Sequence, residues 1–181
     1  EDEFPYGQWE YQIFYRENFD KAKQSLEDNP RNTVKCLFRS GNAENLGKLA
    51  NTAFVRKNNG WFKNGIAPDI ALDESVLSRK ELEIYSKYLS ENGFFGPGSW
   101  YMNTELNNEY NKKAPLQKLK KPTLFIHAKY DRVCDTCHTS LADSMRENCS
   151  NLKEATIESG HWMAQEKPDD VNKTIKEWLA I

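Results

Sequence analysis

The fold of this chain is decided by the stretch Pro122-Thr-Leu-Phe-Ile-His-Ala-Lys-Tyr-Asp131 and by the later stretch Glu158-Ser-Gly-His161-Trp162. The first stretch contains a short, continuous apolar run, Thr123 to Ala128, which is typical of a strand buried on both faces of a parallel sheet. Asp131 and His161 each lie in a loop that follows a predicted strand. Their order matches a triad in which the nucleophile comes first, the acid second and the histidine last.

The region 114–181 alternates between predicted strands and helices. After the strand that begins at Thr123, we expect a helix over 139–146, a second strand over 152–157 and a final helix that begins at Pro168. Proline is favoured in the first turn of a helix, which supports that last boundary. The sequence therefore predicts a β-α-β-α unit of the α/β class.

The preceding region, 1–113, is predicted to be mostly helical. Ser78 and Glu81 form a capping box, and an amphipathic helix follows it and stops near Gly93. Pro97 and Gly98 are expected to turn the chain. The other predicted helices cover residues 9–15 and 19–27, with a break between them, and residues 30–38 and 100–110. The chain thus divides into a helical block, 1–113, and an α/β block, 114–181.

Composition and charge exclude several classes of function. The 181 residues carry a formal net charge of -2, and there is no cluster of Lys and Arg, so we expect no nucleic acid partner. The apolar runs have the length of strands, so we expect no membrane span. Because the chain opens on Glu1 rather than on methionine, we expect its natural N-terminus to lie upstream. We predict a cytoplasmic location, with secretion as the alternative.

The segment Cys134-Asp-Thr-Cys137-His138 matches the pattern for covalent haem attachment. Its context argues against haem, because it directly follows a strand and no distal ligand segment is arranged around it. A redox C-x-x-C motif would open a helix in a thioredoxin-like unit, which the sequence lacks. We interpret the segment as a surface loop with two thiols, free or bridged, and expect neither a metal nor a cofactor. A metal or redox role is the alternative.

Taken together, the motifs resemble those of soluble epoxide hydrolases with the α/β-hydrolase fold, of the kind that fungi and animals carry. The resemblance runs over essentially the whole chain and is strongest at four places in order: Trp9-Glu-Tyr11-Gln-Ile-Phe; Leu77-Ser78 through Gly96-Pro97-Gly98-Ser99-Trp100-Tyr101; His127-Ala-Lys-Tyr-Asp131; and Gly160-His161-Trp162 with Glu166-Lys167-Pro168. It implies that residues 1–113 form a helical lid and that residues 114–181 form the C-terminal part of the hydrolase core.

The resemblance also implies a reaction in two halves. A nucleophilic Asp attacks an epoxide carbon and forms an alkyl-enzyme ester. Tyr11 and Tyr101, by their positions, would donate hydrogen bonds to the departing epoxide oxygen. His161 would then take a proton from the water that attacks the ester, and Asp131 would orient the imidazole and stabilise its charged form.

Four aromatic residues complete the predicted site. By the same resemblance, Trp9, Phe14, Trp100 and Trp162 are expected to bind a small apolar epoxide, with Trp162 packed beside the histidine. Tyr15, Tyr85 and Tyr88 are expected to serve packing.

The nucleophile is the feature that the sequence lacks. No G-x-S-x-G or G-x-D-x-G elbow is present. We therefore expect the nucleophilic Asp on an N-terminal half of the same enzyme, and we expect this chain alone to be inactive. Two alternatives are open: a related lid-bearing hydrolase, such as a haloalkane dehalogenase or an esterase, and a hydrolase-like binding protein without activity. The two phenols favour the epoxide, because halide release needs halide-binding donors instead.

Overall fold

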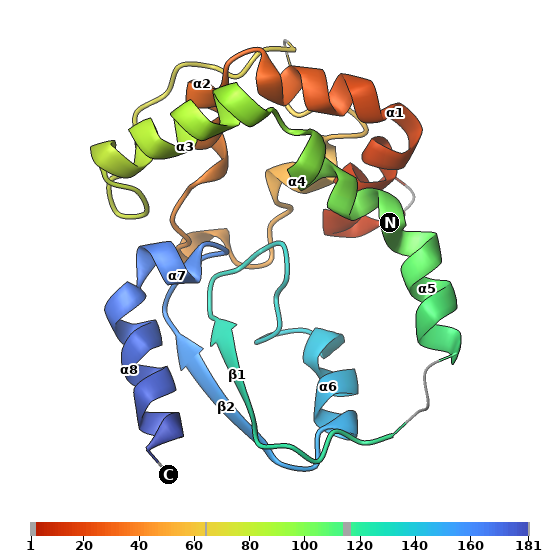
Figure 1. The fold of residues 1–181 in the computed structure, drawn as a ribbon, viewed down its shortest axis with the longest axis vertical. Helices are drawn as coiled ribbons and strands as arrows, with labels where there is room; N and C mark the ends of the chain where they lie inside the picture. The colour runs from red at the N-terminus through yellow and green to blue at the C-terminus, as the bar shows by residue number, and fades with distance from the viewer. Residues whose placement is uncertain (1–2, 64, 114–116, 181) are drawn as a thin grey trace. The chain divides into compact units, whose positions relative to one another are not determined.

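The computed structural model describes residues 3–63, 65–113 and 117–180. The chain forms two compact units, which can be followed by colour in Figure 1. The helical unit consists of Glu1–Phe38 and Leu49–Ala114, and the sheet unit consists of Arg39–Lys48 and Pro115–Ile181. The segment Arg39–Lys48 thus joins the sheet unit, which a single division after residue 113 does not anticipate. That the units are a lid and a hydrolase core stays a prediction.

The helical unit begins with the short helix η1 (Gly7–Trp9) and the long helix α1 (Glu10–Glu27). Helix α1 is kinked at Asn18, whose φ of -145° and ψ of 48° are not helical, and this agrees with the predicted break before residue 19. Helix α2 (Pro30–Leu37) follows, with its proline in the first turn. The side chain of Asn29 caps it by accepting a hydrogen bond from the Asn32 N–H.

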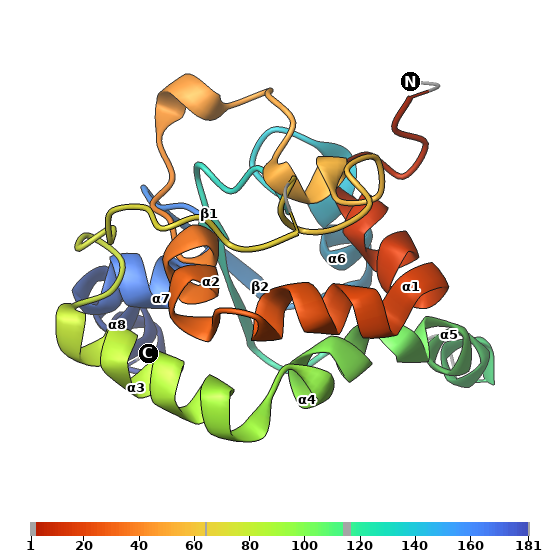
Figure 2. The same ribbon diagram turned by 90° about the horizontal axis from the view of Figure 1, so that it is seen from above.

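Helix α3 (Arg79–Asn92) has the predicted boundaries. Both hydrogen bonds of the capping box between Ser78 and Glu81 are present. The helix ends at Gly93, whose φ of 71° lies in the left-handed region that glycine adopts without strain. Helices α2 and α3 pack side by side in Figures 1 and 2, and the rings of Phe38 and Tyr85 meet at 4.9 Å between centroids.

The predicted turn at Pro97 and Gly98 is wrong, because both residues lie inside a short helix, α4 (Phe95–Ser99). Proline is compatible with this position because the first N–H groups of a helix have no intrahelical partner. Gly98 also allows a close approach to α1, since a Cβ there would lie 3.0 Å from Phe19 Cε2. The predicted helix over 100–110 is present as η4 (Trp100–Asn103) and α5 (Thr104–Lys113).

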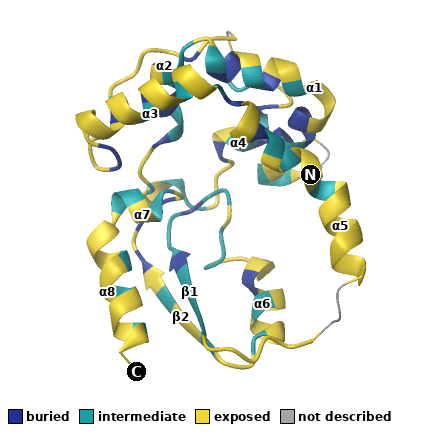
Figure 3. Cartoon of the chain, viewed as in Figure 1, coloured by how far each residue is buried: buried dark blue, intermediate teal, exposed yellow. Residues whose placement is uncertain are grey.

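The core of the helical unit is built largely from aromatic side chains. Helix α1 shows buried and exposed positions alternating along its length in Figure 3, as expected of an amphipathic helix. Burying one large apolar side chain stabilises a fold by roughly 1.5–3 kcal/mol. The buried members of this cluster are Tyr11, Phe14, Tyr15, Ala22, Leu26, Val55 and Phe94.

The sheet unit contains two parallel strands, β1 (Thr123–Ala128) and β2 (Leu152–Ile157), which pair in register from Thr123 opposite Leu152 to Ala128 opposite Ile157. The elements that follow β1 are η5 (Ser140–Ala142) and α6 (Asp143–Asn148), and those that follow β2 are α7 (Met163–Glu166) and α8 (Pro168–Leu179). Helices α6 and α8 flank the strands on opposite sides in Figure 1. The predicted β-α-β-α order is therefore confirmed.

Two details of the sheet unit differ from the prediction. The helix expected over 139–146 begins later, because the Thr139 hydroxyl accepts a hydrogen bond from the Leu141 N–H and caps the first turn. Strand β1 is half-buried rather than fully buried, with His127 as its buried residue. The physical reason is that the sheet has two strands within the described residues, which leaves the strand's side chains partly uncovered. Figure 3 shows β1 mostly in the intermediate colour and β2 with several exposed positions.

One property of the helices bears on the predicted lack of a membrane span. Within residues 3–63, 65–113 and 117–180, every helix is too short or too polar to cross a bilayer.

Candidate active site

Asp131 is held in place by the backbone of its own loop. The loop follows β1, and the Asp131 N–H donates to the carbonyl of Ala128 at 3.2 Å. One carboxylate oxygen, Oδ1, accepts hydrogen bonds from the N–H groups of Val133 at 2.8 Å and Cys134 at 3.0 Å. Such local hydrogen bonds are typical of Asp in turns. They fix the buried carboxylate so that its second oxygen, Oδ2, points out of the loop.

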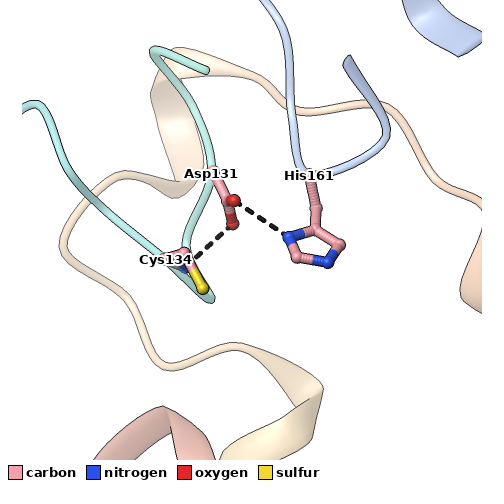
Figure 4. A group of neighbouring side chains, drawn as sticks. All are labelled: Asp131, Cys134 and His161. Carbon is pink, nitrogen blue, oxygen red and sulfur yellow. Dashed lines mark hydrogen bonds and ion pairs between the residues drawn. The ribbon is translucent and has the colours of Figure 1, made fainter. Parts of the chain in front are cut away.

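His161 is brought to Asp131 because parallel pairing continues past the ends of the strands. The Lys129 N–H donates to the Ile157 carbonyl, and the Tyr130 N–H donates to the Ser159 carbonyl, each at 2.9 Å. The two loops therefore leave the sheet together. His161 Nδ1 lies 2.9 Å from Asp131 Oδ2, and a dashed line in Figure 4 marks this interaction. The structure thus brings together the acid and the histidine that the sequence singles out.

The electrostatics of the pair define the protonation of the imidazole. Burial acts to raise the pKa of Asp131, but the hydrogen bond from His161, its charge and the loop N–H groups outweigh this and hold that pKa below its ordinary value. The hydrogen bond to Asp131 raises the pKa of His161, although burial opposes it. An ionised carboxylate only accepts hydrogen bonds, so Nδ1 carries the proton. In the neutral ring, Nε2 is then the basic nitrogen.

The histidine loop is anchored by contacts that the sequence alone did not reveal. Glu166 Oε2 accepts hydrogen bonds from the N–H of Gly160 at 2.8 Å and from the N–H of Gly41 at 3.3 Å. The backbones of the two glycines lie so close that a Cβ on Gly160 would be 2.5 Å from Gly41 N. Both positions therefore require glycine. The ring of Trp162 meets the ring of His161 edge-on at 5.4 Å.

His127 ties the acid loop to the second strand. It is buried, with Nδ1 2.9 Å from the hydroxyl of Thr136 and Nε2 2.9 Å from Glu154 Oε1. Arg146 donates to the same carboxylate oxygen. Cys134 and Cys137, in the same loop, are not bridged by a disulfide.

Tyr11 and Tyr101 lie together in the helical unit. Tyr11 extends from α1 and Tyr101 from η4, and their rings meet edge to face with centroids 5.1 Å apart. Tyr15 stacks on Tyr101 at 5.3 Å. The side-chain amide of Gln12 donates to the Tyr11 hydroxyl at 3.1 Å. The structure therefore places the two predicted tyrosines in one aromatic cluster.

Tyr15 is the third tyrosine of that cluster. Burial raises its pKa to about 12, although the hydrogen bond that Trp61 Nε1–H donates to its hydroxyl at 3.2 Å acts in the opposite direction. Its phenol is therefore held in the neutral form, in keeping with a packing role.

The four predicted substrate-binding residues lie in different environments. Phe14 is fully buried in the core of the helical unit, whereas Trp9 is 37% exposed and Trp100 is 77% exposed. Trp162 is half-buried beside His161. Whether these side chains contact a substrate stays a prediction.

Comparisons with known proteins point to one family. The chain is 32% identical over 174 residues to bifunctional epoxide hydrolase 2 of Rattus norvegicus, an alignment that covers 93% of this chain and 29% of the rat protein. The protein of the same name from Mus musculus is 30% identical over 173 residues, with the same coverage of both chains. The crystal structure of epoxide hydrolase A from Mycobacterium thermoresistibile matches with a TM-score of 0.72 at 21% identity, covering 94% of this chain and 51% of that one. No model of a protein family matches the chain.

The chain is short relative to the proteins that it matches. The chain spans less than a third of the length of the two curated relatives and about half of the solved structure. Within that span, the agreement in sequence covers nearly the whole chain, which confirms the resemblance that the motifs indicated. The homologues of this chain are epoxide hydrolases, and its fold is consistent with a C-terminal portion of the α/β-hydrolase fold.

Proposed function

We propose that the protein to which this chain belongs hydrolyses a small apolar epoxide to a vicinal diol. The observation that carries this proposal is the hydrogen bond between Asp131 and His161 in the loops that follow two adjacent parallel strands. The homology to epoxide hydrolases supports it from a second direction. A further support is the pairing of Tyr11 with Tyr101, the two phenols that the reaction needs.

In the first half of the reaction, the epoxide ring opens. A carboxylate oxygen of an Asp outside this chain forms a bond to one epoxide carbon, and the bond between that carbon and the ring oxygen breaks. The oxygen would leave as an alkoxide, which is a poor leaving group. Tyr11 and Tyr101 would donate hydrogen bonds to it, and one of them would pass its proton. A phenol with a pKa of ~10 stays protonated at neutral pH yet is far more acidic than an alcohol.

In the second half, water cleaves the ester. His161 Nε2 would take a proton from the water, and the resulting hydroxide would attack the ester carbonyl, releasing the diol and restoring the Asp carboxylate. Asp131 would hold the imidazole in the required tautomer and stabilise its cation, because its pKa is held low by its hydrogen bonds.

Several narrower predictions depend on this proposal. Trp9, Phe14, Trp100 and Trp162 would supply the apolar surroundings of the substrate. The nucleophile would come from an N-terminal half of the enzyme, so the isolated chain would be inactive. The cytoplasmic location expected from the sequence also stays a prediction.

A single-turnover experiment on the complete protein tests the proposal. In the variant His161→Gln, ring opening should proceed while hydrolysis of the ester stops. Mass spectrometry should then show a covalent adduct equal in mass to one molecule of the epoxide. A related esterase or dehalogenase would instead form an adduct from an ester or a haloalkane, and a binding protein would form none. The absence of an epoxide adduct in a folded variant would overturn the proposal.

A further inference from the structure

The loop that carries Asp131 and the nearby His161 together offer three possible metal ligands. The proposed hydrolysis uses Asp131 and His161 but gives no role to Cys134. We propose that Asp131, Cys134 and His161 form a binding site for a zinc ion. One carboxylate oxygen, one sulfur and one ring nitrogen from these residues all lie within 4.8 Å of one another. Figure 4 shows Cys134 and His161 on either side of the Asp131 carboxylate. The sequence alone predicts no metal here, and this proposal differs from that prediction.

The distances are close to those of an occupied site. Zinc binds carboxylate oxygen, imidazole nitrogen and thiolate sulfur at about 2.0–2.3 Å, so that the ligand atoms of a tetrahedral site lie about 3.4–3.8 Å apart. Asp131 Oδ2 and His161 Nδ1 already lie 2.9 Å apart. The largest adjustment is therefore about 1 Å. Cys134 is exposed and lies three residues after Asp131 in the same loop, so rotation of its side chain can provide this movement.

The chemistry of the three ligands selects the type of cation. Calcium and magnesium bind through oxygen atoms, whereas a thiolate together with an imidazole is typical of zinc. Zinc with three protein ligands keeps a fourth position for water. Within the part of the chain that the structure describes, this is the one group that brings three such ligands together.

Occupation by zinc would change the state of each ligand. The Cys134 thiol would lose its proton to solvent, because the thiolate is the form that binds metal. His161 would present a nitrogen lone pair in place of an N–H, and its hydrogen bond to Asp131 would be replaced by shared coordination. The imidazole could then no longer be oriented by Asp131 as a base. The zinc site does not depend on the proposed hydrolysis. The inference that bound zinc would prevent hydrolysis rests on the proposed function.

A competing zinc site can be drawn from the same loop. Cys134, Cys137 and His138 also have the spacing of metal ligands in sequence. The geometry favours the first arrangement, because among the described residues only Asp131, Cys134 and His161 bring three such ligand atoms within 4.8 Å of one another. Because Cys134 belongs to both sites, variants of Cys137 and of His161 are needed to distinguish one site from the other.

The experiment is a zinc titration of the reduced protein in competition with a chromophoric chelator. The wild type should bind one equivalent of zinc. The variants Cys134→Ser and His161→Gln should each bind at least about 100-fold more weakly, because losing even a partner of a metal ligand costs 10–100-fold. Cys137→Ser, a matched change in the same loop, should leave the affinity unchanged. Circular dichroism would establish that each variant is folded.

Two results would overturn the site. One is the absence of stoichiometric zinc binding by the wild type. The other is an equal loss of affinity in Cys137→Ser with none in His161→Gln, which would move zinc to the C-x-x-C-H segment. Substituting cobalt for zinc provides a check on the wild-type protein. A thiolate bound to cobalt gives a charge-transfer absorption in the near ultraviolet, and an imidazole bound to cobalt has shifted NMR signals. The absence of either signal would also contradict the proposal. None of these measurements involves an epoxide, so they are independent of the proposed activity.

Discussion

The two units of the molecule position their candidate functional groups by different means. In the sheet unit, Asp131 and His161 are fixed by directed hydrogen bonds: loop N–H groups donate to Asp131, and the Gly160 N–H of the histidine loop donates to Glu166. In the helical unit, Tyr11 and Tyr101 are placed by ring packing around Tyr15.

Because of this difference, the two units should respond differently to amino-acid substitutions. Hydrogen bonds fix orientation and depend on the charge of their partners, so the sheet unit should be sensitive to the loss of a single polar atom. Ring packing depends on shape, so the helical unit should tolerate the loss of a hydroxyl but not of a ring. The predictions below test this contrast.

The largest effect is expected from the histidine. In the complete protein, His161→Gln should lower turnover by about 10⁴-fold or more, as loss of the base does in triad enzymes. The substitution should lower the free energy of unfolding by at most about 1–3 kcal/mol, the worth of one hydrogen bond to a charged group, because the His161 side chain is 45% exposed. Steady-state kinetics and denaturant unfolding measure the two quantities. Turnover within tenfold of the wild type would remove His161 from the mechanism.

A smaller loss of activity is expected from the tyrosines. Tyr11→Phe and Tyr101→Phe should each slow ester formation by about 10²–10³-fold, since each removes one donor to the developing charge but keeps the ring. Their stability should change little, which would distinguish hydroxyl chemistry from packing. Tyr15→Phe is the matched control from the same cluster and should retain ester formation. Equal rates in all three variants would show that the phenols do not take part.

An effect on stability is expected where the two glycines of the sheet unit meet. Gly160→Ala places a Cβ 2.5 Å from Gly41 N, and overpacking of this kind costs about 1–3 kcal/mol or more. Gly96→Ala, in α4, is the control, because a Cβ there meets nothing within 4 Å. Hydrogen exchange should show the loss in the sheet unit and leave the helical unit protected. Equal stability of the two variants would contradict the close approach.

A second effect on stability is expected at high pH. The pKa of Tyr15 is raised to about 12 in the folded state, against an ordinary value of ~10. Above pH ~10 the unfolded chain loses this proton first, so stability falls as the pH rises. The loss should reach about 2–3 kcal/mol near pH ~12, where the folded state also ionises. Tyr15→Phe should show a smaller decline in unfolding experiments across this range, and an identical decline would exclude the buried phenol as its source.

Local signals explain why much of the fold could be predicted from the sequence. The start and end of α3 follow from Ser78, Glu81 and Gly93, which act within one turn of their own position. Strand β1 and the loop of Asp131 follow from a continuous apolar run and the acid after it. The turn expected at Pro97 was wrong because the first turn of a helix and a free turn favour the same residues.

Contacts between distant residues explain what could not be predicted. Gly41 and Glu166 are 125 residues apart, and no local pattern marks Gly41 as a neighbour of the histidine loop. The proximity of Tyr11 to Tyr101 was expected only through resemblance to a family, since aromatic residues on separate helices carry no signal of mutual contact. Cys134 was interpreted from its spacing to Cys137, whereas its neighbours in space are Asp131 and His161.

The segment Arg39–Lys48 has a consequence for how this protein can be recombined. Because the chain passes between the units after Phe38, after Lys48 and after Ala114, neither unit is a continuous stretch of sequence. A chimera of two homologues with one crossover between residues 49 and 114 would combine Gly41 from one parent with Gly160 from the other. Crossovers that respect the fold must therefore exchange both segments together, and a library built on a single crossover would be depleted of folded members wherever the parents differ at that glycine contact.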